Sequence, residues 1–272
     1  MNRAIKNRTR GKQRADLPDL PAMNWPALLA RYNDRANYEA GTINTRVIKP
    51  PSPTACSRTG WATPRRTSVA GALYLTRHGA TALNNAPEER LRGWLDVGLA
   101  GSGVVAARRA SRVLQPLEPA RLFSSDLTRA HDTARIMSVV LGLPVEPTRN
   151  LRPWHVGAFA GEPVSVAGPA LEAYMTTRAT EKVPQGESFR DFMQRWRREL
   201  TRLLALMRKL DAPVIAVTHA RNLYALNALL FGDEVPVKGP PHPGAIVELT
   251  GAPGEVTLRT LYRGHGVEVA PS

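Results

Sequence analysis

From residue 71 onward, short apolar runs alternate with longer segments of mixed character. The runs at 72–77 and 214–219 contain four or more consecutive apolar residues, a pattern typical of buried strands, and the segment RLFSS at 121–125 also indicates a strand. The first run ends at His78-Gly79, and the glycine indicates a turn. The pattern predicts strands at 72–77, 121–125, 143–151, 214–219, 245–250 and 256–262.

Helical periodicity fills the spaces between these strands. It is strongest over 187–210, where large apolar residues recur every three or four positions and Arg and Lys occupy the opposite face. Ser188 with Asp191 resembles a capping box at its start. We predict further helices at 101–114, 126–142 and 220–232. For 126–142, Ser125 or Asp126 is the expected N-cap and Gly142 the expected C-cap.

Strands that alternate with helices predict an α/β fold, here a three-layer α/β/α sandwich with a mostly parallel central sheet. Ligands of such folds bind at the carboxyl ends of the strands. Two histidines, His78 and His219, stand at the ends of predicted strands, and Arg129 lies near the start of a helix that follows a third. The sequence therefore predicts that these three side chains meet at one edge of the sheet.

Composition changes at about residue 70, and we expect two parts: a basic, largely irregular N-terminal extension at 1–70 and a catalytic domain at 71–272. The extension holds 13 Lys/Arg and 4 Asp/Glu, which is most of the formal charge of +14. It contains a short helical pattern at 22–38 and a Pro- and Ser-rich linker at 40–70. Residues 1–14 carry six basic groups and no acid, so they are a candidate for weak contact with nucleic acid or an acidic partner, although a solvated tail is the simpler interpretation.

The remaining composition excludes several classes. A single cysteine, Cys56, cannot form an intramolecular disulfide, which favours a reducing compartment. No segment approaches the roughly 18 apolar residues of a membrane span. We therefore expect a cytoplasmic protein without a membrane partner.

The chemistry of the strand ends points to a phosphate. Arg77 and His78 leave the first strand together, and Arg129 and His219 join them in the expected fold. Guanidinium groups bind phosphate oxygens in a bidentate manner, and a neutral imidazole is a competent nucleophile toward phosphorus. Each residue alone has an ordinary structural explanation, but their joint occurrence at strand ends favours a phosphate site.

Five segments resemble the histidine phosphatase superfamily, the phosphoglycerate mutase-like group. TRHGATALN (76–84) is similar to its Arg-His-Gly-x-Thr-x-x-Asn signature, and FSSDLTRAHDTA (123–134) closely resembles a second motif. GWLDVGLAGSG, VPQGESF and VTHARN (93–103, 183–189 and 217–222) follow in family order. The resemblance spans about 71–250 and does not extend to 1–70.

The resemblance implies a phosphomonoesterase in which His78 becomes phosphohistidine and Arg77, Arg129 and His219 hold the phosphoryl oxygens. Four further residues are expected to bind substrate: Thr81, Asn84, Glu187 and Ala220. No metal ion or other cofactor is expected, because the cationic side chains supply the positive charge. The expected partner is a small phosphorylated substrate.

Two departures from the family pattern affect function. Pro153 stands where many members have the glutamate that protonates the leaving oxygen, so His155 is our first substitute and Glu187 and Glu162 are weaker ones. Ala80 replaces a glutamate that is common after Arg-His-Gly. The alternatives that stay open are a phosphoglycerate mutase-type phosphotransferase, a catalytically weak phosphate-binding or adaptor protein, and a nucleic-acid-associated protein whose basic arm is primary.

Overall fold

A computed structural model describes residues 71–84, 88–231, 241–251 and 256–264. The predicted helix at 22–38, the linker at 40–70 and the whole extension at 1–70 lie outside the described residues. Among the described helices, none is long and apolar enough to cross a membrane.

The strands form one six-stranded sheet with the order β3-β2-β4-β1-β5-β6. The strands β1 (Leu73–Arg77), β2 (Arg121–Ser125), β3 (Val145–Thr148) and β4 (Val214–Thr218) run parallel to one another. Then β5 (Ile246–Thr250) and β6 (Thr257–Tyr262) extend the sheet by antiparallel pairing. The predicted mostly parallel sheet is thus confirmed.

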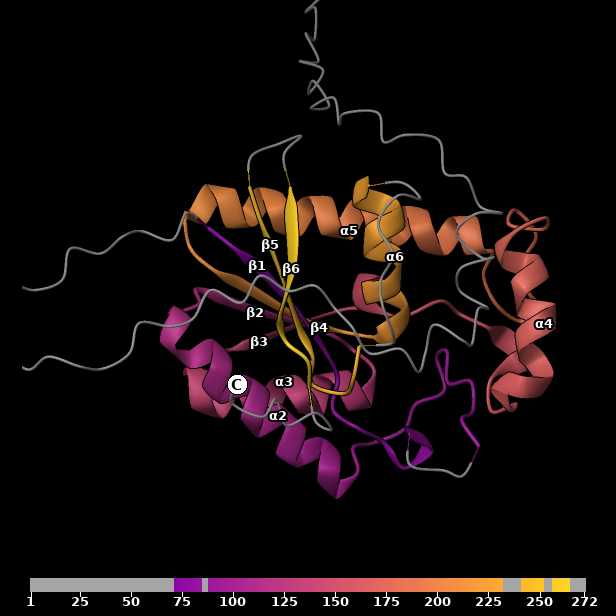
Figure 1. The fold of residues 1–272 in the computed structure, drawn as a ribbon, viewed down its shortest axis with the longest axis horizontal. Coiled ribbons are helices and arrows are strands. Elements are labelled where there is room, and N and C mark those ends of the chain that lie inside the picture. Colours follow the sequence, from indigo (N-terminus) through magenta and orange to yellow (C-terminus); the bar gives the residue numbers. More distant parts are fainter. Residues whose placement is uncertain (1–70, 85–87, 232–240, 252–255, 265–272) are drawn as a thin grey trace, which may run out of the picture.

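Helices cover both faces of this sheet, which confirms the three-layer α/β/α architecture (Figure 1). The helices α2 (Gly101–Leu114) and α3 (Thr128–Leu141) lie on one face, and α5 (Phe189–Leu210) and α6 (Ala220–Phe231) on the other. Successive residues of β1 divide between the two cores, since Leu73 and Leu75 pack with α5 and α6 while Tyr74 packs with α2 and α3. Every residue of β1 and β4 is buried, which explains why both strands are apolar up to the polar residues at their carboxyl ends.

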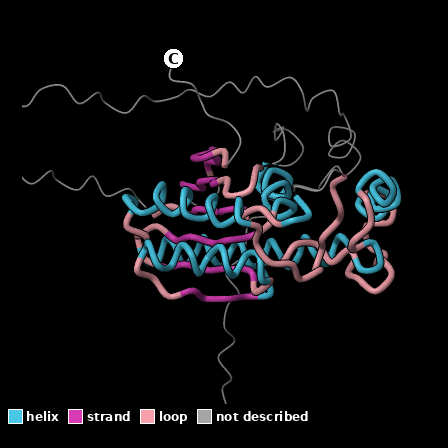
Figure 2. Tube along the Cα trace, turned by 90° about the horizontal axis from the view of Figure 1, so that it is seen from below, coloured by secondary structure: helices cyan, strands magenta, loops and turns pink. Residues whose placement is uncertain are grey.

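One helix was not predicted. The helix α4 (Val164–Met175) contains Gly168 and Pro169, two residues that disfavour helices, and it lies at one end of the molecule beyond the sheet (Figures 1 and 2). Its apolar side chains Leu171, Tyr174 and Met175 are buried in the same core as α5. Tertiary packing therefore overrides the weak local preference.

The start of α3 also differs from the prediction. The helix begins at Thr128, with Leu127 at the N-cap position and no cap from its own segment. Its N-terminus is instead capped by Asp96, whose carboxylate accepts hydrogen bonds from the Thr128 backbone N–H (2.8 Å) and hydroxyl (2.9 Å). Ser125 and Asp126 are engaged elsewhere, with His219 and Arg152 respectively.

The other helix boundaries agree more closely with the sequence. Gly142 ends α3 with a left-handed φ of 68°, as expected for a C-cap glycine. Ser188 caps α5 by accepting a hydrogen bond from the Asp191 backbone N–H at 3.0 Å. The predicted strand at 143–151 is shorter, because β3 ends at Thr148 and a 3₁₀ turn covers Arg149–Leu151. Three further 3₁₀ turns cover Ala82–Asn84, Gln115–Leu117 and Gly157–Phe159.

Candidate active site

The two histidines meet because their strands are neighbours in parallel register. Arg77 of β1 pairs with Thr218 of β4, so the next residue of each strand, His78 or His219, emerges at the same edge. The His78 backbone N–H donates to the Thr218 carbonyl at 2.9 Å. The two rings are buried in an edge-to-face arrangement with centroids 5.1 Å apart. The expected convergence of the imidazoles is therefore present.

One nitrogen of His78 is held by its own loop. The Nδ1 atom lies 2.7 Å from the Gly79 carbonyl oxygen, which can only accept a hydrogen bond, so Nδ1 carries the ring proton. The Nε2 atom is consequently the one with a free electron pair. Burial, followed by the positive charges of Arg129 and Arg77, lowers the pKa of His78 well below its ordinary value, so the ring is neutral at physiological pH.

The loop after His78 is packed tightly against the first turn of α2. A Cβ atom on Gly79 would lie 2.4 Å from the Gly103 carbonyl oxygen, so only glycine fits there. The Gly79 backbone N–H donates to the Thr133 hydroxyl at 2.9 Å, which ties the loop to α3. These contacts fix the backbone that carries the His78 ring.

Arg129 is almost fully buried, with 1% of its surface exposed. Two of its nitrogens donate to backbone carbonyls in the loop before α2, Nη1 to Leu95 and Nη2 to Gly93, each at 2.8 Å. Its Nε atom is buried and has no hydrogen-bond partner among the described residues. Burial, followed by the charge of Arg92, lowers the pKa of Arg129 to about 9, so the group is cationic at neutral pH but poorly compensated by nearby acids.

A residue that the sequence analysis did not single out, Arg92, belongs to the same cluster. Its Nη2 atom pairs with Glu89 at 3.0 Å, while Nη1 is buried with no hydrogen-bond partner in the described part of the chain. Its charge lowers the pKa values of both His78 and His219. Backbone hydrogen bonds between Leu91 and residues 161–162 hold the segment that carries it. Its position directly before the motif at 93–103 is the only sequence signal that marks it.

The remaining member of the cluster is Arg77, which is 5% exposed and donates from Nη1 to the Pro241 carbonyl. We call His78, His219, Arg77, Arg92 and Arg129 the anion cage. Three guanidiniums and two neutral imidazoles lie together, and one buried nitrogen each of Arg92, Arg129 and His219 has no hydrogen-bond partner among the described residues. Such groups are costly to bury unless an anion accepts their hydrogen bonds. The arrangement suits a dianionic tetrahedral group.

The predicted pocket residues Thr81 and Asn84 form a turn next to His78. The Asn84 Oδ1 atom accepts hydrogen bonds from the Thr81 backbone N–H (3.0 Å) and hydroxyl (3.1 Å). Ala220 begins α6 beside His219, where its methyl side chain has no polar group to offer. The structure thus places these three residues near the histidines.

His155 and Glu187 form a separate cluster around Trp94. The His155 ring packs against the Trp94 ring with centroids 4.2 Å apart, and its Nδ1 atom accepts a hydrogen bond from the Gly157 backbone N–H at 3.1 Å. Glu187 accepts from the His155 backbone N–H (3.0 Å) and from Arg195 (2.7 Å). Among the described residues, no hydrogen bond or ring contact links His155 to the two buried histidines. Burial, partly opposed by Glu187, lowers the pKa of His155.

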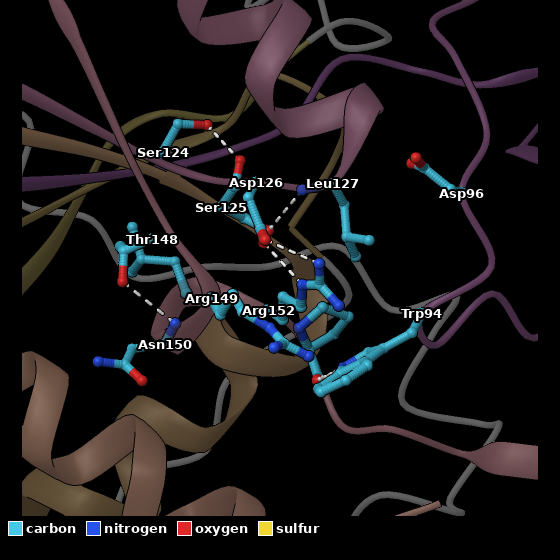
Figure 3. Close-up of polar contacts among 12 residues, drawn as sticks. Trp94, Asp96, Ser124, Ser125, Asp126, Leu127, Thr148, Arg149, Asn150 and Arg152 are labelled. Atoms are coloured by element: carbon cyan, nitrogen blue, oxygen red, sulfur yellow. Dashed lines mark hydrogen bonds and ion pairs between the residues drawn. The ribbon is translucent and has the colours of Figure 1, made fainter. Parts of the chain in front are cut away.

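The loop that carries Pro153 is held by charged groups. Arg152 makes a two-pronged ion pair with Asp126 (2.6 and 2.7 Å) and lies over the Trp94 ring at 4.6 Å (Figure 3). The Pro153 carbonyl accepts from Trp94 Nε1 (2.8 Å) and Arg195 Nη2 (3.1 Å). The backbone at this position is therefore firmly placed, although its side chain carries no acid. Within the described ranges, there is no group of three or more His, Cys, Asp or Glu residues that could hold a metal ion.

Comparisons with known proteins agree with this geometry. The sequence profile of the histidine phosphatase superfamily (branch 1) matches residues 73–262. The chain is 32% identical over 197 residues to the glucosyl-3-phosphoglycerate phosphatase of Mycolicibacterium vanbaalenii, covering 66% of this chain and 84% of that protein. It is 28% identical over 164 residues to a probable phosphoglycerate mutase GpmB of Yersinia pestis, covering 59% of this chain and 74% of that protein.

Solved structures give the same result. The structure of a mycobacterial glucosyl-3-phosphoglycerate phosphatase in complex with VO3 superposes with a TM-score of 0.56 at 30% identity, over 70% of this chain and 97% of that one. A phosphoglycerate mutase from Bacillus anthracis has a TM-score of 0.60 at 22% identity, over 70% of this chain and 92% of that one, which supports the fold alone. The chain described here belongs to the histidine phosphatase superfamily (branch 1).

Proposed function

We propose that the protein is a phosphomonoesterase that works through a phosphohistidine at His78. The observation that carries the proposal is the hydrogen bond from Nδ1 to the Gly79 carbonyl, which leaves the Nε2 electron pair available inside a cage of cationic donors. A phosphatase relative at 32% identity supports hydrolysis rather than another reaction of the family.

In the first step, His78 Nε2 attacks phosphorus, a P–N bond forms and the P–O bond to the leaving group breaks. The leaving oxygen then takes a proton. In the second step, water attacks phosphorus and gives one proton back to the group that protonated the leaving oxygen, the P–N bond breaks, and the products are inorganic phosphate and neutral His78. Charge on the phosphoryl oxygens is stabilised by Arg77, Arg92, Arg129 and His219, which is the positioning and electrostatic work that phosphoryl transfer requires. Since three guanidiniums supply this charge, we expect turnover to persist in excess chelator.

The proton for the leaving oxygen has no dedicated carboxyl donor in this proposal. Glu187 is held by Arg195 and by the His155 backbone, so His155 stays our candidate acid, with delivery from Nε2 because Nδ1 accepts the Gly157 N–H. The lowered pKa of His155 means that its protonated form gains population only below the ordinary range of a histidine. We therefore propose an acid-type phosphatase, in which turnover of alkyl phosphates falls as pH rises through the pKa of His155.

The primary test is turnover of p-nitrophenyl phosphate by the full-length protein, together with trapping of an acid-labile phosphoenzyme. We expect His78→Ala to lower kcat by about a thousandfold or more and to abolish labelling. The matched control is His131→Ala, because His131 lies on α3 outside the anion cage. If wild type binds phosphate but shows neither turnover nor label, the adaptor alternative replaces the enzyme.

The identity of the acid has its own test. Aryl phosphates have good leaving groups and need little protonation, so His155→Asn should slow glycerol phosphate about a hundredfold while slowing p-nitrophenyl phosphate much less. Equal slowing of both substrates would remove His155 from this role. A mutase would instead transfer the phosphoryl group between hydroxyls of a phosphoglycerate, which product analysis distinguishes from release of inorganic phosphate.

A further inference from the structure

His219 raises the question of where its single ring proton lies. The side chain is 2% exposed, and burial, followed by the charges of Arg129 and His78, lowers its pKa well below the ordinary value. It is therefore neutral and has one N–H to offer. Its Nδ1 atom is buried without a hydrogen-bond partner among the described residues, whereas Nε2 lies 2.9 Å from the Ser125 hydroxyl. A proton on Nε2 would leave a lone pair on Nδ1 in the anion cage, where it would repel a phosphoryl oxygen.

The surroundings of Ser125 decide between the two tautomers. The Ser125 Oγ atom already faces a donor, the Leu127 backbone N–H at 3.4 Å, which can only give a proton (Figure 3). A serine oxygen can accept two hydrogen bonds, but a buried hydroxyl proton also needs an acceptor, and among the described residues His219 Nε2 is the acceptor within hydrogen-bond distance of it. With Nε2 accepting from the hydroxyl, the ring proton of His219 lies on Nδ1.

We propose that Ser125 is a positioning residue that holds the ring proton of His219 on Nδ1, so that the neutral imidazole donates a hydrogen bond to the transferring phosphoryl group. The inference rests on the proposed function and adds to it a role for a residue outside the anion cage. Ser125 does not contact the phosphoryl group in this account. It acts through His219 alone.

The central sheet places this serine beside His219. Ser125 is the last residue of β2, which lies beside β4 in the sheet, and it is fully buried. The neighbouring Ser124 donates its hydroxyl proton to the Ser125 carbonyl at 2.7 Å (Figure 3). The two adjacent serines are equally buried, but the Ser124 hydroxyl bonds to a backbone carbonyl, whereas the Ser125 hydroxyl lies within hydrogen-bond distance of the His219 ring. Ser124→Ala is therefore a matched control for Ser125→Ala.

The direct experiment is ¹⁵N NMR of the histidine rings in full-length wild type, Ser125→Ala and Ser124→Ala, with His219 assigned by comparison with His219→Asn. We expect wild type to show His219 protonated at Nδ1 and bare at Nε2, both without ligand and with inorganic phosphate. In Ser125→Ala the proton should move partly or wholly to Nε2, while Ser124→Ala should match wild type. A wild-type proton on Nε2, or an unchanged tautomer in Ser125→Ala, would overturn the proposal.

Kinetics and phosphate binding of the same variants provide a second test of the role of Ser125. For p-nitrophenyl phosphate, kcat/KM of Ser125→Ala should fall about 10- to 100-fold, the range found when a metal-binding histidine loses its outer partner. The dissociation constant of inorganic phosphate should rise, and Ser125→Cys, whose thiol is a weak donor, should give intermediate values. An equal loss in Ser124→Ala would assign the effect to packing and reject the role. Should wild type show no turnover or phosphoenzyme, the proposed function fails, yet the NMR tautomer and the phosphate titration still decide the role of Ser125.

Discussion

The contact between the His78 loop and α2 leaves no room for a single additional carbon atom, and this gives the sharpest test of how the fold supports the site. Gly103 is buried in the first turn of α2. A Cβ atom there would lie 2.1 Å from the Ala80 carbonyl oxygen and 2.8 Å from its amide nitrogen. That is roughly 1 Å inside ordinary van der Waals contact. Because both atoms belong to the backbone, no side-chain rotation relieves the overlap.

Two opposing effects of known size therefore determine the stability of Gly103→Ala. Alanine in a helix is favoured over glycine by about 1 kcal/mol, whereas overpacking costs about 1–3 kcal/mol and lies at the upper end when backbone must move. We expect a net loss of about 2 kcal/mol in the free energy of unfolding, measured in urea. Because the loop that moves carries His78, a displacement of about 1 Å should also lower kcat for p-nitrophenyl phosphate by about a hundredfold.

Gly101 of the same helix is the control. A Cβ atom on Gly101 would meet nothing within 4 Å, so Gly101→Ala should be neutral or stabilising by up to about 1 kcal/mol, with unchanged turnover. If Gly103→Ala proves as stable and as active as Gly101→Ala, the close approach of α2 to the His78 loop is not what positions the nucleophile.

Three further expectations follow from the anion cage and its supports. Arg92→Gln should weaken inhibition by inorganic phosphate about tenfold. The ligand-free variant should be at least as stable as wild type, because the substitution removes a positive charge close to Arg129. Substitution of the exposed Arg90 by Gln is the control, and a loss of stability in Arg92→Gln would contradict the expectation. Asp96→Ala should lower the free energy of unfolding by about 1 kcal/mol through loss of the α3 cap, and an unchanged urea midpoint would refute it. Because His78 and His219 have lower pKa values folded than unfolded, the unfolded chain binds protons first as pH falls below about 6.5, and each ring should remove up to about 1.4 kcal/mol of stability per pH unit. His78→Asn should reduce that slope, and equal slopes in wild type and His78→Asn would show that the pKa of His78 is not lowered in the folded protein.

The sheet was predictable because its central strands are buried on both faces and therefore contain short apolar runs that end in polar residues. The long helix α5 was predictable for the opposite reason, since one face is buried and the other carries charge. The helix α4 was not, because Gly168 and Pro169 argue against a helix and only the packing of Leu171, Tyr174 and Met175 favours one. The cap of α3 was also beyond local inspection, since Asp96 is separated from Thr128 by 32 positions and the nearer candidates are used by other partners.

The residues of the candidate site also fall into two groups, those that the sequence reveals and those that only the folded structure reveals. His78, His219 and Arg129 were identified because strand ends in a parallel sheet converge, and that rule needs only the order of elements. Arg92 and Ser125 were missed because their significance lies in what surrounds them: Arg92 has a buried donor without a partner among the described residues, and the Ser125 hydroxyl lies 2.9 Å from a ring nitrogen of His219. Such properties arise from packing partners distant in the chain, so an isolated arginine or serine gives no sign of them.

In the proposed mechanism, the groups that transfer the phosphoryl group and the loop at Pro153, where the family resemblance places a proton donor, belong to separate parts of this fold. Arg152 keeps its ion pair with Asp126, and the Pro153 carbonyl keeps its bonds to Trp94 and Arg195, so the backbone that would present an acid is held as firmly as a functional loop would be. The anion cage uses none of these contacts, since His78 and His219 are fixed by β1, β4 and Ser125. Under that mechanism, the lack of a carboxyl at position 153 removes help for the leaving oxygen but leaves the placement of His78 intact. It follows that the rate should depend steeply on the leaving group's own acidity, more so than in a relative that keeps the acid.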